Sequence, residues 1–448
     1  MRTIGFAAAK RFAVHTAPGS GRRTTGYRAL AVILTATTAF TTGLIAAGHV
    51  TAQPDPPPPP PSADPFYSYD QPLGPVPPGT ILRSRSAPFA AGNLPTPVIG
   101  TQVLYRTTNQ QANPTSTVAT VLRPLTSGPA RLVSYHMAYD ALGSECDPSY
   151  TLTGHADHGV AMAEQAVVAG YLAAGYTVVV PDYEGPELEW TVGRQSGYAA
   201  LDGIRAAEEL LGLPDSTPVA LIGYSGGSVP TEWAAEVAPR YAPELAVVGA
   251  AAGGLPVDLA HNLPYISGSP QWAGVIPALV VAYQRAYGLD TAAFLSTRGN
   301  EVVDAVNGLC IGQFASDYPG LTDADMVRAP YTSLLDVPQV VAAIDDNIMG
   351  TAGTPAVPLL LAVGQVDPTG DSVMVTRDVE GLAHEYCDRG VAVTYTRYDG
   401  RAHGAAFAPF EAQAAQFLAD RFTGAPPPNN CATVGPGNTL TPTPLPIG

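Results

Sequence analysis

Residues 219–237 place a serine between a short apolar run and a segment with helical spacing. The run Val219–Ile222 has the length and composition of a buried strand, and the apolar residues after the serine recur at helical intervals. Between them, Gly223, Ser225 and Gly227 follow the pattern G-x-S-x-G. Small residues on both sides let the backbone turn sharply enough to expose the serine hydroxyl. This stretch therefore predicts a strand, a tight turn and a helix, with Ser225 on the turn.

Other apolar runs alternate with helical stretches along the chain. The predicted strands are 117–122, 131–135, 176–181, 219–222, 246–251, 357–363 and 391–398, with helices such as 159–174 and 199–211 between them. This alternation is typical of an α/β fold, a mainly parallel sheet covered by helices. About 100 residues separate Gly254 from Val357, far more than one helical crossover needs. Helical patterns at 272–287, 292–295 and 331–348 predict a helical cap here, at about residues 256–350, over the serine.

Residues 1–52 have the layout of a secretory signal peptide. Six basic residues and no acidic one precede Gln53, an apolar stretch runs from Ala29 to about Gly48, and Val50–Ala52 ends in small residues. An uncleaved membrane anchor is the alternative, since about 20 residues can span a bilayer. The pair Arg22-Arg23 leaves a twin-arginine export route open beside the general one. We therefore expect an exported protein, extracellular or associated with the cell wall.

The remaining chain divides by composition. Residues 53–65 are typical of a stiff proline-rich spacer, 66–424 of the α/β domain with its cap, and 425–448 of an irregular tail. The net charge of −16, from 38 acidic against 22 basic residues, argues against nucleic-acid binding. Four cysteines without a C-x-x-C spacing favour disulfides in an oxidising compartment over a zinc site.

A serine hydroxyl is a poor nucleophile until a base takes its proton and a carboxylate orients that base. In a fold of this kind the acid follows the serine along the chain and the histidine comes last, each on a loop after a strand. His403 follows the predicted strand 391–398 and precedes a helical stretch, whereas His384 lies inside one. We therefore predict His403 as the base.

Two aspartates compete for the role of the acid. Asp367 lies three residues after Gly364, where the end of the strand still faces the serine. Asp371 is placed to cap the helix that we expect to start near Ser372. We therefore predict Asp367 as the acid and keep Asp371 as the alternative. Gly226, directly after Ser225, is placed to donate one backbone N–H to the oxyanion of a tetrahedral intermediate.

Five sequence blocks together resemble the secretory lipase family of the α/β-hydrolase fold, which includes the yeast lipase A type and exported actinobacterial lipases. In order, the blocks are SYHMAYDALGSECDPSY, VVPDYEGPELEW, ALDGIRAAE, GYSGG and AAAGGLPVDL. The resemblance covers roughly residues 67–422 and implies a lid domain at 257–347. The site residues that it implies are the nucleophile Ser225, its partners Asp367 and His403, and an oxyanion hole formed by the backbone of Asp140 and by Gly226. The acid loop, DPTGDSV, is longer than is usual in the family, which keeps Asp371 open.

The four cysteines allow three pairings. We predict Cys146 with Cys310, which would tie the cap to the face that carries the serine. We also predict Cys387 with Cys431, which would pin the tail to the domain. The family resemblance implies the same two pairs.

These residues predict an exported carboxylic ester hydrolase, foremost a triacylglycerol lipase, that acts through an acyl-enzyme on Ser225 and needs no metal or cofactor. The expected partner is a lipid or small ester, with a lipid–water interface as one place where the enzyme would meet it, and we expect a monomer. The alternatives are an acyltransferase with the same triad and a catalytically idle cell-surface binding protein. Other polar residues have structural interpretations: Asp182 and Glu184 as loop-holding acceptors, His155 and His158 as polar loop residues, and Asp202 with Arg205 as an ion pair.

Overall fold

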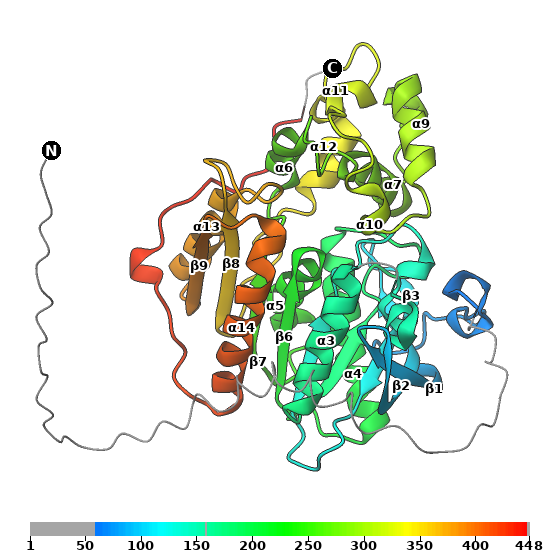
Figure 1. Cartoon of the computed structure of the whole chain (residues 1–448), viewed down its shortest axis with the longest axis vertical. Coiled ribbons are helices and arrows are strands. Elements are labelled where there is room, and N and C mark those ends of the chain that lie inside the picture. Colours follow the sequence, from blue (N-terminus) through cyan, green and yellow to red (C-terminus); the bar gives the residue numbers. More distant parts are fainter. Residues whose placement is uncertain (1–58, 157–158, 446–448) are drawn as a thin grey trace, which may run out of the picture. The chain divides into compact units, whose positions relative to one another are not determined.

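The computed structural model describes residues 59–156 and 159–445. All of them belong to one of the two compact units of the chain, residues 57–448. Nine strands form one sheet in the order β1-β2-β3-β5-β4-β6-β7-β8-β9 (Figure 1). The pairs from β5 through β4 to β9 are parallel, whereas β1, β2, β3 and β5 are joined by antiparallel pairs. The mainly parallel sheet predicted from the alternation of strands and helices is therefore confirmed.

Seven of the strands were expected from the sequence and two were not. The strands are β1 (Ile81–Ala91), β2 (Leu94–Thr108), β3 (Pro114–Leu122), β4 (Leu132–His136), β5 (Thr177–Pro181), β6 (Val219–Tyr224), β7 (Val247–Gly253), β8 (Leu359–Gln365) and β9 (Val393–Asp399). The unexpected pair, β1 and β2, contains Pro88, Pro95 and Pro97, which break the apolar pattern of a strand. Proline is tolerated here because β1 is an edge strand and Pro95 lies close to the hairpin turn.

Helices cover both faces of the sheet. Those that follow the strands are α3 (Gly159–Ala173), α4 (Gly193–Leu211), α5 (Ser228–Tyr241), α13 (Thr376–Asp388) and α14 (His403–Phe422). Side chains alternate along β6, so that Val219 and Leu221 pack in the core with α4 and α5. Ala220 and Ile222 pack on the opposite face, in the core with α3 and α14. A continuous apolar run is therefore what a strand buried on both faces requires.

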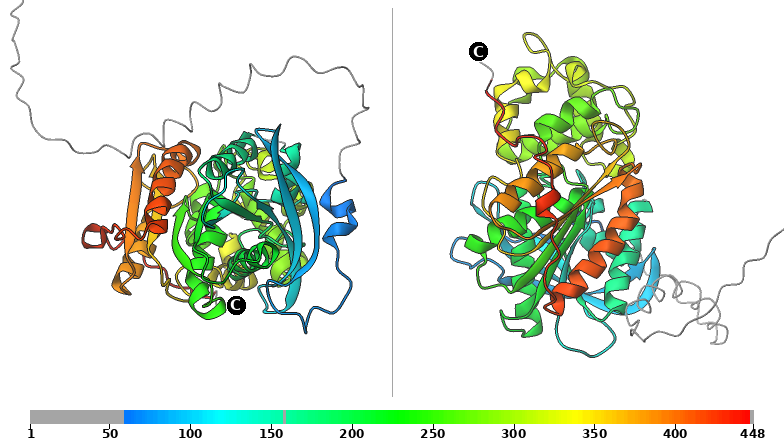
Figure 2. Two further views of the ribbon diagram at one scale, coloured as in Figure 1. Left: turned by 90° about the horizontal axis from the view of Figure 1, so that it is seen from below. Right: turned by 90° about the vertical axis from the view of Figure 1, so that its left-hand side faces the viewer.

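The long connection between β7 and β8 is helical, as predicted. Its helices are α6 (Leu259–Ile266), α7 (Val275–Tyr287), α8 (Thr291–Phe294), α9 (Thr297–Val306), α10 (Ile311–Phe314), α11 (Asp323–Met326) and α12 (Pro338–Asp345). They gather beyond one end of the sheet (Figures 1 and 2), and we call residues 255–350 the cap. Short turns complete the structure at α2 (Pro148–Tyr150), Pro61–Ala63, Pro65–Tyr67, Ser144–Cys146, Thr151–His155, Ser225–Gly227, Leu334–Asp336 and Cys431–Thr433.

The two ends of the described chain pack on the domain. The predicted signal peptide, 1–52, lies outside the described residues. The predicted spacer, 53–65, extends too far, because Pro61 is buried and Asp64 forms an ion pair with Arg85 at 2.5 Å. Within residues 59–156 and 159–445, no helix is both long and apolar enough to cross a membrane.

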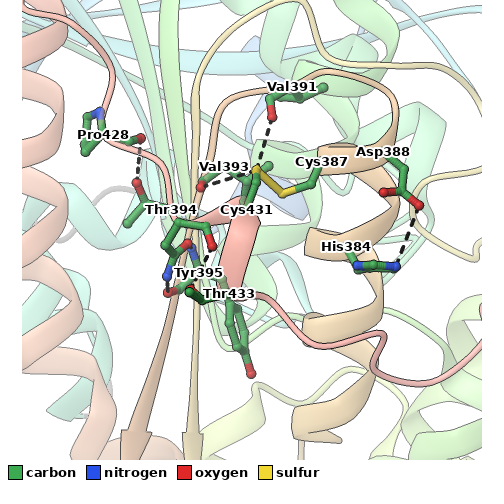
Figure 3. Close-up of a disulfide and its surroundings, with 11 residues drawn as sticks. His384, Cys387, Asp388, Val391, Val393, Thr394, Tyr395, Pro428, Cys431 and Thr433 are labelled. Carbon is green, nitrogen blue, oxygen red and sulfur yellow. Dashed lines mark hydrogen bonds and ion pairs between the residues drawn. A yellow bond between two sulfur atoms is a disulfide. The ribbon is translucent and has the colours of Figure 1, made fainter.

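Both predicted disulfides are confirmed. Cys146 is joined to Cys310 across 164 residues, which ties the cap to the loop after β4. Cys387 at the end of α13 is joined to Cys431 in the tail (Figure 3). The tail also pairs with β9, where the Asn430 side chain accepts from the backbone N–H of Tyr395 and donates to its carbonyl. From there it runs up to the cap (Figure 2, right), so covalent and hydrogen bonds hold a segment that has little regular structure.

Candidate active site

The turn that carries Ser225 is shaped by two close backbone approaches. Ser225 begins the short helical turn after β6 and has φ of 55°, a strained value for a residue other than glycine. A Cβ atom on Gly223 would lie 2.0 Å from the Gly227 carbonyl oxygen, and one on Gly227 would lie 2.0 Å from that of His136. Neither position has room for a side chain. The glycines on both sides of the serine therefore allow the sharp turn that the sequence predicted.

His403, the first residue of α14, bridges the serine to a carboxylate. Its Nε2 lies 2.7 Å from Ser225 Oγ, and its Nδ1 lies 2.9 Å from Asp371 Oδ2. A carboxylate only accepts hydrogen bonds, so Nδ1 carries the proton and Nε2 is left to accept from the serine hydroxyl. His403 and Asp371 are both buried, which strengthens these contacts by excluding water. The three side chains form a continuous chain of hydrogen bonds.

The choice of Asp367 as the partner of His403 is wrong, and the alternative, Asp371, takes that place. Asp371 Oδ1 accepts from the backbone N–H groups of Val373 and Met374 at 3.1 and 2.7 Å, which leaves Oδ2 for the imidazole. The Asp371 carbonyl also accepts from the His403 N–H at 2.7 Å. The turn after β8 continues for several residues before it comes back to the site. The carboxylate that bonds to His403 therefore lies later in the loop than the end of the strand suggested.

Asp367 has a different set of contacts. Its Oδ1 accepts from the N–H groups of Thr369 and Gly370 at 2.7 and 3.0 Å, and its Oδ2 accepts from the Tyr265 hydroxyl at 2.8 Å. Burial raises the pKa of this carboxyl, but these three donors outweigh it and hold the pKa below its usual value. Asp367 is thus an ionised carboxylate that closes a turn and meets the cap.

Asp140 and Gly226 lie beside the serine. A Cβ atom on Gly226 would be 1.7 Å from Asp140 Oδ1, so the Asp140 carboxyl lies directly over Gly226. Asp140 has φ of 42° and its Oδ1 accepts from Trp190 Nε1 at 2.5 Å. Burial raises the pKa of Asp140 to about 6, although the Trp190 hydrogen bond and the nearby His403 oppose this.

Two buried glutamates hold the loop of Asp140 in place. Glu184 accepts from the backbone N–H of Ala141 at 3.0 Å. This agrees with the prediction that Glu184 holds a loop by hydrogen bonds. Glu164, which the sequence did not single out, accepts from the N–H of Ala138 at 2.9 Å. The segment from 138 to 141 is therefore fixed on both sides of Asp140. The only signal for Glu164 in the sequence was a glutamate among the apolar residues of the predicted helix 159–174.

The structural roles predicted for Asp182, Asp202 and Arg205 are confirmed. Asp182 accepts from the backbone N–H and hydroxyl of Ser149. Asp202 and Arg205 form an ion pair at 2.7 Å. His155 stacks on Tyr150, whereas His158 lies outside the described residues. Within residues 59–156 and 159–445, no three His, Cys, Asp or Glu side chains are grouped as ligands for a metal ion.

An apolar cavity opens between the serine and the cap. Ser225, Gly226 and Asp140 lie at its floor, and its walls are formed by Trp190, Thr191, Pro256, Leu259, Asn262, Leu263, Ile266, Trp272, Val275, Leu279, Ile311, Val373 and Met374. Most of these residues belong to the cap. The Trp272 ring also packs edge-on against the His403 ring, with centroids 5.6 Å apart. The cavity can therefore take an apolar group next to a hydroxyl that is bonded to an imidazole.

Residues 156–430 match the model of the secretory lipase family. The chain belongs to the secretory lipase family. It is 37% identical to a probable inactive lipase of Mycobacterium tuberculosis, over 82% of this chain and 83% of that protein. It is 31% identical to lipase A of Arthroderma benhamiae, over 83% and 82% of the two chains. The fold is similar to that of Candida antarctica lipase A in its closed state, with a TM-score of 0.77 and 29% identity over 88% of this chain and 91% of that one.

The chain therefore has the α/β-hydrolase fold and is a carboxylic ester hydrolase of the lipase or esterase class. The resemblance seen in the five sequence blocks is confirmed. Because the Mycobacterium tuberculosis relative is named a probable inactive lipase, the presence of each site residue has to be checked in this chain. Serine, imidazole and carboxylate are all present here and hydrogen-bonded to one another.

Proposed function

We propose that this chain is an exported serine ester hydrolase that forms an acyl-enzyme on Ser225, with triacylglycerols as its foremost substrates. The single observation that carries the proposal is the hydrogen-bonded chain Ser225–His403–Asp371 at the floor of an apolar cavity. The apolar lining suits an acyl chain better than a polar group. The secretory family and the signal-peptide layout support export.

His403 acts as the base in the first step. Its Nε2 takes the proton of Ser225 as Oγ attacks the ester carbonyl carbon, and Asp371 holds the imidazole in the required tautomer. The backbone N–H groups of Gly226 and Asp140 stabilise the oxyanion that forms. The intermediate collapses when His403 gives its proton to the leaving alcohol. Water, activated by the same imidazole, then attacks the acyl-enzyme, and the acid product leaves Ser225 free.

Hydrolysis of a triglyceride emulsion, compared with a short soluble ester, tests this proposal. Fatty-acid release from the emulsion by the wild type, with none by Ser225→Ala, is the expected result. Turnover of the soluble ester alone would limit the enzyme to an esterase. Turnover of neither substrate would overturn the proposal and favour a binding protein. N-terminal sequencing of protein recovered from culture medium, with Gln53 expected first, tests export and cleavage.

A further inference from the structure

One cap side chain holds both ends of the loop that carries Asp371. The Tyr265 hydroxyl, on α6, donates to Asp367 Oδ2 at 2.8 Å and accepts from the backbone N–H of Ser372, also at 2.8 Å. Asp367 begins the loop, and Ser372 directly follows the carboxylate that meets His403. A single hydroxyl therefore connects the two ends of the acid loop to the cap.

The end of the loop that Tyr265 holds is strained. Ser372 has φ of 93°, in a region that residues with a Cβ rarely adopt. Such a conformation persists only where its surroundings fix it. Its N–H is held by Tyr265, and its Oγ accepts from Trp272 Nε1 at 3.3 Å. Both partners belong to the cap, so the cap supplies the contacts that keep Ser372 in this conformation.

A second contact from α6 acts on the next residue of the loop. Asn262 Nδ2 donates to the Val373 carbonyl at 2.6 Å. The Val373 N–H in turn donates to Asp371 Oδ1. The position of the acid therefore depends on residues 372 and 373, and α6 contacts both of them.

Asp367 gives Tyr265 its anchor. Its other oxygen accepts from Thr369 and Gly370, which closes the turn that starts the loop. The ionised carboxylate fixes the Tyr265 hydroxyl proton toward itself, so the oxygen lone pairs face the Ser372 N–H. Without Asp367 the hydroxyl would have no fixed direction. This explains why an aspartate other than the acid follows the strand so closely.

We propose that Tyr265 and Asp367 are positioning residues that align Asp371 with His403, so that the cap completes the active site. The inference rests on the proposed function, because it concerns the same acid. A displacement of about 1 Å in a catalytic group can lower a rate by about 100-fold. Tyr265 is not among the residues that line the cavity, so its loss should leave substrate binding unchanged.

Tyr265→Phe tests the proposal, because it removes the hydroxyl and keeps the ring that packs against Gly370. With active sites counted by a phosphonate that labels Ser225, we expect kcat to fall by about 10- to 100-fold and KM to change less than about twofold. Tyr318→Phe is the matched control, since this cap hydroxyl has no hydrogen bond within the described residues, and it should keep the wild-type kcat.

Asp367→Asn provides an independent variant at an exposed position and keeps the size of the side chain. It should lower kcat by a similar factor. Because the two residues act as one unit, the double variant should be no slower than the slower single variant. Wild-type kcat in Tyr265→Phe, a change in KM alone, or losses that multiply in the double variant would overturn the proposal. Failure of the proposed function would appear differently, as activity retained in Ser225→Ala.

Discussion

The turn that carries Ser225 and the loop that carries Asp371 contribute to the same site but are fixed in different ways. The serine turn is fixed by close backbone approaches, within the turn at Gly223 and to β4 at Gly227, which leave no space for side chains. The acid loop is fixed from outside, by hydrogen bonds with Tyr265 and Asn262 of the cap. Backbone sterics determine the first region and side-chain hydrogen bonds with the cap determine the second.

This difference explains what each region can tolerate. A single side chain is enough to violate a steric requirement. The stability of the serine turn should therefore fall sharply when one methyl group is added. Hydrogen bonds across a loop share the task among several residues. The acid loop should therefore respond in graded steps, from the carboxylate itself to the residues that hold it.

Removing the proposed nucleophile should give the largest effect. Ser225→Ala should lower kcat by roughly 10⁵-fold or more, because only the oxyanion donors and substrate binding remain. The variant should stay folded, since no hydrogen bond to the Ser225 side chain other than that of His403 is present in the described part of the chain. His403→Ala should be nearly as inactive. Esterase assays with thermal unfolding check both, and activity within tenfold of wild type in either variant would contradict the assignment.

Replacing each of the two aspartates of the acid loop by asparagine should give unequal effects on kcat. Asp371→Asn should lower kcat by about 10³- to 10⁴-fold, because the amide no longer holds the imidazole in the productive tautomer. Asp367→Asn should cost at most about 100-fold, since it acts through the loop. Parallel steady-state kinetics of the two variants give the comparison. The reverse order would show that Asp367 is the acid in solution.

The sequence predicted the parts of the site that depend on local pattern. Ser225, Gly226 and His403 follow strands whose apolar runs are distinct, so their places could be inferred from spacing. The choice between Asp367 and Asp371 could not, because it depends on how the cap folds back on the loop. Strands β1 and β2 were missed because their prolines conceal an edge hairpin. Glu164 was missed because a buried glutamate in a helix has no pattern of its own.

Adding a methyl group to Gly227 tests whether the serine turn requires glycine for steric reasons. Gly227→Ala would place a Cβ 2.0 Å from the His136 carbonyl oxygen, so we expect a loss of about 3 kcal/mol or more in the free energy of unfolding. Gly404→Ala, next to His403, is the control, because its Cβ would meet no atom within 4 Å. That variant should be unchanged or more stable by up to about 1 kcal/mol. Denaturant unfolding of both proteins makes the comparison, and equal stability would refute the steric account.

The smallest expected effect concerns the carboxyl that lies over the serine turn. Asp371 accepts from two backbone N–H groups and the imidazole, whereas Asp140 has one donor, Trp190, in the described structure. Burial raises the pKa of Asp140 to about 6, above the 3.8 of an exposed aspartate. The folded state therefore holds this proton more tightly than the unfolded state does. Its contribution to stability is largest below about pH 4 and falls as the pH rises to about 6.

Asp140→Asn keeps this group neutral at every pH and keeps its size. Above about pH 6 the wild type has a negative charge beside the forming oxyanion, which weakens the stabilisation that the backbone donors provide. The backbone N–H of residue 140 is unchanged in the variant. The ratio of variant to wild-type kcat/KM should therefore rise by about threefold to tenfold between pH 5 and pH 8. The stability of the variant relative to the wild type should rise over about pH 4 to 6. A rate ratio that stays flat across this range would mean that the Asp140 side chain carries no charge near the oxyanion, and that its place over Gly226 serves packing alone.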